Sequence, residues 1–240
     1  MNSKKISIAI DGPAGSGKST IAKEVALKFG YTYIDTGAMY RAITFKALRE
    51  NICLTDEQQL TQLANHISIV LVYEPLIDGT QLHVIMDGSD VSEEIRSIEV
   101  TNNVSVVAAV SGVREAMVLL QQKMALTGGV VMDGRDIGTV VLPQAELKIF
   151  LTASVTERSK RRWLELKEKG IMVELQELEE QIRQRDYLDS HREISPLCQA
   201  KQAILLDTTS LTIDQVVTKV IELACTKGAQ FDNYLMNKYR

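Results

Sequence analysis

The chain of 240 residues has few cysteines, few histidines and few aromatic side chains. Its cysteines, Cys53, Cys198 and Cys225, are odd in number and far apart, so they indicate neither a disulfide framework nor a zinc site. This usage fits a reducing compartment, and we expect a cytoplasmic protein. The histidines are also scattered, with no partner at metal-ligand spacing: His66, His83 and His191.

Long hydrophobic runs and an excess of positive charge are missing as well. No stretch holds the roughly 18 unbroken apolar residues that a membrane span needs, and none follows Lys4 and Lys5 at the start. The sequence therefore predicts a soluble, unexported protein with no membrane partner. A formal net charge of −4 argues against a basic surface for nucleic acid, so functional arginines must be concentrated locally. We expect a monomer.

One complete motif is present, G-x-x-x-x-G-K-[ST], between the apolar run Ile6–Ile10 and the helical pattern Ile21–Phe29. Its glycines let backbone N–H groups turn toward phosphate oxygens, and the helix adds the positive end of its dipole. Lys18 would reach the outer phosphates, and Ser19 would offer a hydroxyl to Mg²⁺. A merely flexible Gly/Ser turn is the alternative, but the flanking elements favour nucleoside triphosphate binding. The predicted nucleotide-binding residues are Gly12, Pro13, Ala14, Gly15, Ser16, Gly17, Lys18, Ser19 and Thr20.

Short apolar runs alternate with longer amphipathic stretches along the chain. This pattern is typical of βα units around a parallel sheet, in which ligands gather at the carboxyl ends of the strands. The sequence therefore predicts an α/β fold of the three-layer P-loop NTPase type. Its five expected parallel strands are Ile6–Ile10, Tyr31–Ile34, Val130–Met132, Leu147–Leu151 and Ala203–Leu206.

Two segments do not follow this alternation of strands and helices, and we interpret them as insertions: 36–109 and 156–192. The first begins with a predicted helix, Ala38–Glu50, and continues with an N-cap at Thr55 before a helix at 56–66. It then has two strand-like runs separated by turn residues, which predict a small antiparallel sheet. The runs are Ile67–Tyr73 and Gln81–Met86, and the turn residues are Pro75, Asp78 and Gly79.

The second insertion is strongly helical and rich in both charge signs, with Gly170 marking a break between two helices. A mobile charged hairpin over a phosphate site would act as a lid, because its closure excludes water from the transfer.

A GTPase would need a D-x-x-G switch and an N-K-x-D base reader, and the chain has neither.

Arginines recur after the strands and in the second insertion. Arginine makes forked contacts with phosphate that lysine cannot, so this many arginines suggest more phosphate than one triphosphate carries. The arginines in question are Arg41, Arg135, Arg158, Arg161, Arg162, Arg185 and Arg192.

Spacing groups the arginines of the second insertion. Arg158, Arg161 and Arg162 stand at i, i+3 and i+4, which places them on one helix face, where they could clamp the transferring group. A solvated face with glutamate partners is the open alternative. Arg185, Asp189 and Arg192 stand at i, i+4 and i+7, which also predicts one face. A surface salt-bridge ladder, worth roughly 0.3–0.5 kcal/mol per pair, would explain them too, but their position where the lid returns to the core favours the site.

The strand at Val130–Met132 is followed by two carboxylates that enclose an arginine. An apolar strand that ends in aspartate is typical of a magnesium-organising carboxylate, so Asp133 is a candidate for the metal's outer shell. For Asp136, a turn-stabilising role is the alternative, because Gly134 and Gly138 mark a tight bend.

Three of these segments together resemble the long bacterial form of the cytidylate kinase family: Asp35–Arg41, Asp133–Thr139, and Glu157-Arg158 with Arg161-Arg162. The similarity runs to about Lys227. It implies ATP-dependent phosphorylation of CMP and dCMP with Mg²⁺. Another P-loop kinase, acting on UMP or shikimate, is the alternative among enzymes, and a protein that holds ATP without turnover is the alternative from another class.

The resemblance also implies roles for individual residues. Ser105, Arg114 and Asp136 would read the cytosine edge. Arg41, Arg135 and Arg192 would hold the acceptor phosphate, and Arg185 and Asp189 the sugar. Asp35, Thr36 and Tyr40 complete the expected acceptor side, and the expected catalytic residues are Lys18, Arg135, Arg158 and Arg162.

With these roles the chain divides into a core at 1–35, 110–155 and 193–228, a monophosphate-binding insertion at 36–109, the lid at 156–192 and a tail at 229–240.

The sequence departs from the family pattern at one position of the glycine-rich loop. Ala14 has no hydroxyl where some members of the family have a loop serine, so an acceptor-phosphate contact from that side chain is absent.

Overall fold

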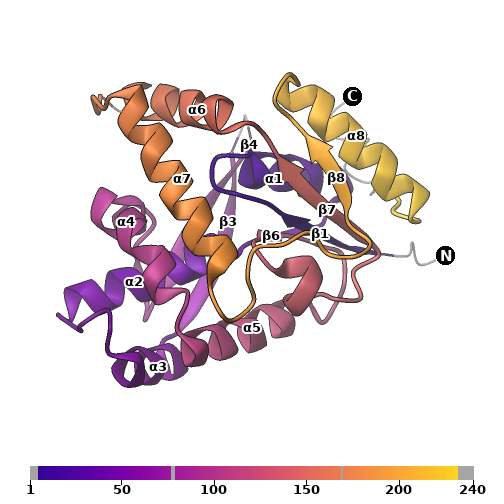
Figure 1. The fold of residues 1–240 in the computed structure, drawn as a ribbon. Helices are drawn as coiled ribbons and strands as arrows, with labels where there is room; N and C mark the ends of the chain where they lie inside the picture. Colours follow the sequence, from indigo (N-terminus) through magenta and orange to yellow (C-terminus); the bar gives the residue numbers. More distant parts are fainter. Residues whose placement is uncertain (1–4, 77–78, 169, 232–240) are drawn as a thin grey trace. The chain divides into compact units, whose positions relative to one another are not determined.

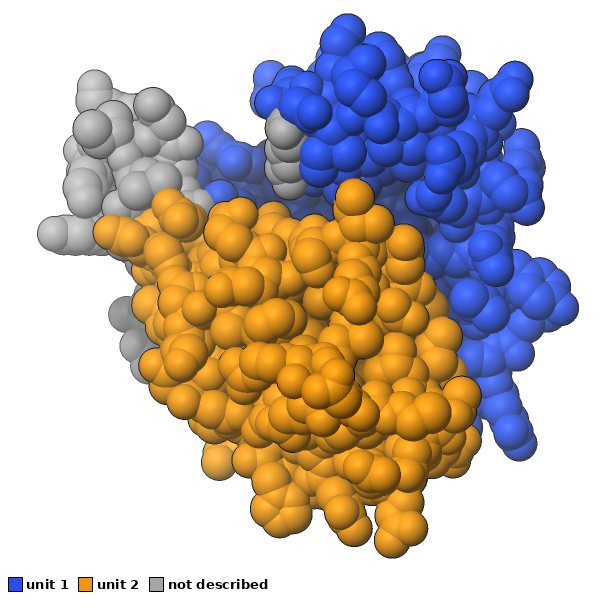
Figure 2. Space-filling view, turned by 90° about the vertical axis from the view of Figure 1, so that its left-hand side faces the viewer, with its two compact units in different colours: residues 1–34, 124–240 blue, residues 35–123 orange. Residues whose placement is uncertain are grey.

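The computed structural model describes residues 5–76, 79–168 and 170–231. They form two compact units, coloured separately in Figure 2: residues 35–123, and the remainder of the described chain. Asp78 of the predicted turn and most of the predicted tail at 229–240 lie outside the described residues.

The first unit contains a five-stranded sheet in the order β2-β6-β1-β7-β8. Figure 1 labels β6, β1, β7 and β8 of this sheet. The central strand β1 pairs in parallel with β6 and β7, and β7 pairs in parallel with β8. The predicted fold class is confirmed, and all five predicted strands are present with ends shifted by at most two residues. The strands are Ser7–Asp11 (β1), Thr32–Asp35 (β2), Val130–Gly134 (β6), Leu147–Thr152 (β7) and Ile204–Asp207 (β8).

The two central strands explain where the polar side chains gather. Every residue of β6 is buried, and Ile8, Ala9 and Ile10 of β1 have no exposed surface, as expected for a parallel sheet covered on both faces. In the register of the pair, Ile10 lies opposite Asp133 and Asp11 lies opposite Gly134. The carboxyl ends of β1 and β6 therefore bring two aspartates to the same edge of the sheet.

Helices complete this unit. The helix α1 packs on β6 and against α8, while α6 and α7 pack on each other (Figure 1). Gly170, with φ of 75°, lies between α6 and α7, as predicted. The helices are Lys18–Phe29 (α1), Val155–Glu168 (α6), Leu175–His191 (α7) and Ile213–Thr226 (α8), with one π-helical turn, Ile137–Val141 (η2).

The end of α7 corrects one prediction. The helix stops at His191, and Arg192 has extended backbone angles, with φ of −62° and ψ of 144°. Arg192 therefore does not share a helix face with Arg185 and Asp189, because it has already left the helix.

The second unit holds the predicted small antiparallel sheet, β3-β4-β5, of which the two-residue β5 was not predicted. Its strands are Ile69–Leu76 (β3), Gly79–Met86 (β4) and Ser89–Asp90 (β5). The helices are Thr36–Arg49 (α2), Glu57–His66 (α3), Ile98–Val107 (α4) and Ser111–Ala125 (α5, whose last two residues belong to the first unit), with a 3₁₀ turn, Glu94–Arg96 (η1).

The predicted N-cap of α3 is wrong by one residue. The carboxylate of Asp56, not the hydroxyl of Thr55, accepts the N–H of Gln59 at 2.9 Å. Both residue types cap helices well, so the sequence pattern alone does not separate the two neighbours.

Within the described ranges, no single helix is long and apolar enough to cross a membrane. The pair α4 and α5 passes that test only when taken together, and the two helices are bent by 99° at their junction. Localisation and oligomeric state stay predictions.

Candidate functional site

The glycine-rich loop between β1 and α1 is shaped by backbone conformations that favour glycine. Gly12, Gly15 and Gly17 have φ angles of 151°, 74° and 91°. A Cβ atom at Gly12 would lie 2.0 Å from the carbonyl oxygen of Leu151, and one at Gly15 would lie 3.2 Å from Cβ of Arg158. The loop therefore packs directly on the end of β7 and the start of α6, with no room for a side chain at Gly12 and a tight fit at Gly15.

Replacing Gly12 with alanine is expected to lower the free energy of unfolding by about 3 kcal/mol, since it adds a clash with backbone to a conformation that L-residues avoid. Gly170→Ala is the matched control, because Gly170 also has positive φ but nothing within 4 Å of the added atom. It should lose only about 1–2 kcal/mol. Urea unfolding measures both; equal losses would show that the close approach to Leu151 is not limiting.

Lys18 starts α1 and is buried, with its Nζ donating to the carbonyl of Pro13 at 2.7 Å and to Oγ of Ser16 at 3.4 Å. Burial, and then the positive charge of Arg135, hold the pKa of Lys18 well below its ordinary value, although Asp133 acts in the opposite direction. A desolvated ammonium next to a second cation is a favourable place for an anion, which would offset both effects.

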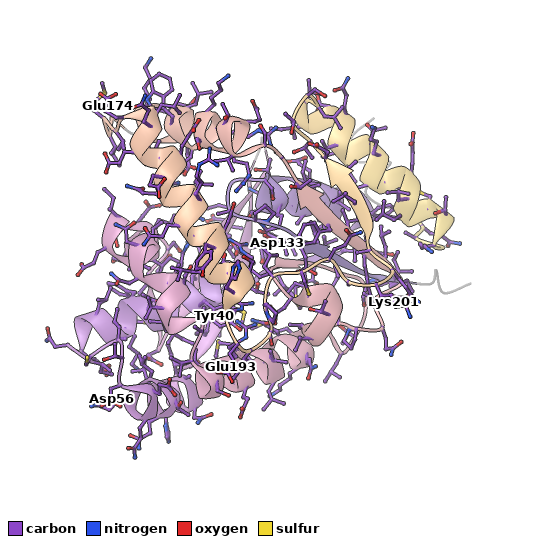
Figure 3. The ribbon with its side chains drawn as sticks, in the orientation of Figure 1. Tyr40, Asp56, Asp133, Glu174, Glu193 and Lys201 are labelled. Atoms are coloured by element: carbon purple, nitrogen blue, oxygen red, sulfur yellow. The ribbon has the colours of Figure 1, made fainter. Side chains whose placement is uncertain are left out.

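Asp133, at the end of β6, receives two hydroxyl donors and is labelled in Figure 3. Ser19 Oγ donates to its Oδ2 at 3.0 Å, and Tyr33 Oη donates to its Oδ1 at 2.8 Å. Asp133 is 4% exposed, whereas Ser19 is exposed. A hydroxyl and a carboxylate side by side are oxygen donors of the kind Mg²⁺ prefers, and Mg²⁺ usually takes only one or two protein ligands beside water and phosphate. The donor set therefore fits this ion.

Arg135 and Asp189 form a buried ion pair, with Nε donating to Oδ2 at 2.7 Å. Burial would lower the pKa of Arg135, but the Asp189 carboxylate outweighs it and the pKa is raised. Burial would likewise raise the pKa of Asp189, but Arg135 and then Arg185 outweigh it and the pKa is lowered. Both partners are thus charged. The positive charges of Arg135 and Arg185 both act to lower the pKa of Lys18, so these three cationic side chains share one region of the first unit.

Arg192 and Asp136 also face each other, with 3.8 Å between Nη2 and Oδ1 and both side chains 5% exposed. Arg192 Nε donates to the carbonyl of Ser195 at 2.7 Å. Asp136 is the N-cap residue of η2, yet its side chain makes no capping hydrogen bond. The alternative of a turn-stabilising aspartate is therefore not observed.

The three clustered arginines of α6 have different partners. Arg158 is buried, and its guanidinium donates to the carbonyls of Ala153 and Ala14 at 2.9 and 3.0 Å and pairs with Asp186 at 2.7 Å. It therefore joins α6 to the glycine-rich loop and to α7. The other two arginines make these contacts: Arg161 with Glu157 and with Thr208, and Arg162 with Glu165 at 2.8 Å.

The glutamate partners of Arg161 and Arg162 are those expected for a solvated helix face. The three arginines thus have separate sets of partners in this structure, and a clamp on the transferring group stays a prediction.

In the second unit, the structure places the predicted residues on α2, α4 and α5. Asp35 accepts the N–H of Ala38 at 2.9 Å and so acts as the N-cap of α2. The buried Arg114 donates to the carbonyl of Ala108 at 3.0 Å, and its guanidinium carbon lies 5.4 Å from the ring centroid of Tyr40, which Figure 3 labels. Such a cation–π contact restrains both side chains. Of the remaining residues, Thr36 is buried, and Arg41 and Ser105 are half-buried.

The sequence model of the family described as cytidylate kinase matches residues 8–226. A cytidylate kinase from Bacillus velezensis is 59% identical over 225 residues, which cover 94% of this chain and 99% of that relative. The chain belongs to the cytidylate kinase family. A cytidylate kinase from Streptococcus sanguinis is 56% identical over 221 residues, covering 92% and 97%. The predicted resemblance is thus confirmed.

Among solved structures, an uncharacterized protein from Eubacterium ventriosum matches with a TM-score of 0.50 at 12% identity, covering 92% of this chain and 99% of that one, which shows the fold alone. A shikimate kinase from Acinetobacter baumannii has a TM-score of 0.46 at 14% identity, covering 95% and 97%. That likeness carries no argument about the acceptor. Relatives named cytidylate kinase do not favour the shikimate or UMP alternative.

Four residues at the site of this family member were missed by the sequence interpretation. For Asp11 a signal existed, since it ends an apolar strand immediately before the loop just as Asp133 ends β6. Tyr33, Asp186 and Thr208 carried none, because their roles depend on partners far away in the chain: Asp133, Arg158 and Arg161 respectively.

Proposed function

We propose that this chain transfers the γ-phosphoryl group of ATP to the 5′-phosphate of CMP or dCMP, giving the diphosphate and ADP. A member of the cytidylate kinase family is a nucleoside monophosphate kinase, a phosphotransferase. The observation that carries the proposal is the buried array at the carboxyl ends of β1 and β6, where Lys18, Asp133 and the Arg135–Asp189 pair meet in a chain of this family.

The reaction needs no catalytic base, because the nucleophile is already an anionic phosphate oxygen. The work is positioning and charge neutralisation. Lys18 is suited to this because its ammonium is desolvated and repelled by the positive charge of Arg135, so a bound phosphate anion would stabilise it. Backbone N–H groups of the loop Gly12–Gly17 would hold the donor phosphates in place.

We propose that Ser19 and Asp133 hold Mg²⁺ together with the phosphates. When bound, this ion neutralises charge on the phosphate oxygens. Tyr33 would orient the carboxylate for that task, since its hydroxyl already engages the second oxygen of Asp133.

On the acceptor side, we assign residues by likeness to the family. Arg41, Arg135 and Arg192 would bind the acceptor phosphate, Arg185 and Asp189 the sugar, and Ser105, Arg114 and Asp136 the base. Burial supports these roles, because Arg114, Asp136 and Asp189 are each at most 4% exposed and a buried polar group discriminates strongly. The segments 36–109 and 156–192 would serve as the monophosphate-binding insertion and the lid.

A coupled assay of ADP formation against CMP, dCMP, UMP, AMP and shikimate tests the proposal. Rapid turnover is expected with the two cytidine monophosphates. Turnover with shikimate and none with pyrimidine monophosphates would overturn it, and ATP binding with no turnover on any acceptor would favour a regulatory protein.

Arg162 tests the lid. If its guanidinium reaches the transferring group when substrates bind, Arg162→Ala should lower kcat at least ten-fold and change KM for CMP little, because the lost interaction belongs to the transition state. Arg183→Ala is the matched control, as Arg183 makes an exposed ion pair with Glu179 on α7. An effect confined to KM would place Arg162 in substrate binding, and no effect would leave it on a solvated face.

A further inference from the structure

The carboxylate of Asp11 occupies an unusual position at the end of β1. It is 3% exposed and accepts two consecutive backbone N–H groups, those of Ile137 and Gly138, each at 2.7 Å. Hydrogen bonds to an ionised carboxylate are roughly twice as strong as neutral ones. One side chain of β1 thus holds the start of η2, a segment 126 residues away in the chain.

The first N–H groups of a helical turn have no partner within the turn and need an oxygen from elsewhere. In η2 the internal bonds begin with the N–H groups of Val140 and Val141, which donate to the carbonyl of Asp136. The N-cap residue usually supplies the missing oxygen, and aspartate is among the best residues for it. The N-cap residue here is Asp136, but its side chain makes no such bond.

We propose that Asp11 caps η2 in place of Asp136, and that this cap fixes the turn that carries Asp136 and so holds its carboxylate in position for the cytosine of the acceptor. Asp11 is thereby a positioning residue for base selectivity. The inference rests on the proposed function, in which Asp136 reads the base. Because Asp11 of β1 caps η2, the Asp136 carboxylate faces Arg192 rather than the backbone of its own helical turn.

Packing supports this assignment. A Cβ atom at Gly138 would lie 3.3 Å from Oδ2 of Asp11 and 3.2 Å from Cδ of Lys148. The absence of a side chain at Gly138 therefore lets the Asp11 carboxylate approach closely. Asp11 also lies opposite Gly134 in the β1–β6 register, next to the turn that it caps.

The charge state of Asp11 is consistent with this role. Burial raises the pKa of Asp11 to about 6, although the N–H groups of Gly138 and Ile137 act to lower it. The carboxylate is therefore mainly ionised only above about pH 6.

Asp11→Asn is the decisive variant, because it keeps the size of the side chain but replaces one acceptor oxygen with an NH₂ group that faces an N–H. The value of kcat/KM for CMP should fall at least ten-fold and that for UMP should fall less, so that the ratio of the two narrows. Adding Asp11→Asn to Asp136→Ala should change this ratio by less than about two-fold, because both substitutions remove the same selectivity.

Glu146→Gln is the matched control. Glu146 is an exposed carboxylate that accepts the N–H of Ser7 at 2.9 Å, at the opposite end of β1. Neither substrate should be affected by this change. Equal losses for CMP and UMP in Asp11→Asn, or effects on the ratio that multiply in the double variant, would overturn the inference and leave Asp11 a merely structural residue.

Hydrogen exchange tests the cap without activity. The amide protons of Ile137 and Gly138 should exchange slowly in the wild-type chain and faster in Asp11→Asn, while that of Val131 in β6 stays unchanged. If the variant does not fold, fast exchange of both amides in the wild-type chain would still refute the cap. Failure of the wild-type chain to phosphorylate CMP, with slow exchange at these amides, would instead refute the proposed function.

Discussion

Replacing Lys18 with alanine is expected to lower kcat about a thousand-fold, ~4 kcal/mol at the transition state, without lowering the free energy of unfolding. The two effects separate because the ammonium is desolvated in the folded chain and lies near the positive charge of Arg135, conditions that already lower its pKa. Its removal relieves that repulsion. Under the proposed function, however, the same ammonium neutralises charge on the phosphates during catalysis.

Steady-state kinetics and urea unfolding of the same preparation measure both effects. Lys23→Ala is the matched control, since Lys23 lies on the same helix but outside the loop. It should leave kcat within about two-fold. Retention of most of the activity by Lys18→Ala, with an unchanged unfolding transition, would contradict the assignment of the loop to phosphate.

Replacing Asp136 with alanine is expected to lower kcat/KM for CMP at least ten-fold, about 1.4 kcal/mol, and to narrow the CMP-to-UMP ratio. Cytosine presents an amino donor beside two acceptors, and a carboxylate is the partner that the amino group requires. Uracil has a carbonyl at that position, which would face the carboxylate as acceptor against acceptor. Leaving a buried polar group unpaired costs about 1–3 kcal/mol, more when it is charged.

Asp136→Asn sharpens this test, because its amide can donate to the uracil carbonyl and so should favour UMP more than the alanine variant does. Both substrates are measured on all three proteins. Equal losses for CMP and UMP would show that Asp136 serves the phosphates or the fold and not the base.

Much of the core was predictable because its signals are local. A strand, a glycine-rich turn and a helix are contiguous from Ile6 to Phe29, so the conformation of each part follows from neighbouring residues. The same holds for the alternation of apolar runs that predicted five strands, and for Gly170 between two helices. Arg192 was placed wrongly on a helix because spacing does not show where a helix ends when neither glycine nor proline marks its end.

The roles of the charged residues were less predictable. Arg158, Arg161 and Arg162 have the spacing of a single face, but Arg158 is buried against the loop and Asp186 whereas Arg162 pairs with Glu165. Sequence spacing gives the direction in which a side chain leaves its helix. It does not show which backbone carbonyl or carboxylate lies opposite.

By itself the sequence determined the fold class, the glycine-rich loop and the family, because each of these depends on the chemistry of contiguous residues. Only the tertiary structure decided which groups each of the three aspartates contacts. Asp11, Asp133 and Asp136 all lie at or just after the carboxyl end of a buried strand, yet one accepts two backbone N–H groups, one accepts two hydroxyls and one faces an arginine. The physical reason is that an interaction between groups far apart in the chain leaves no trace in the local pattern of either segment.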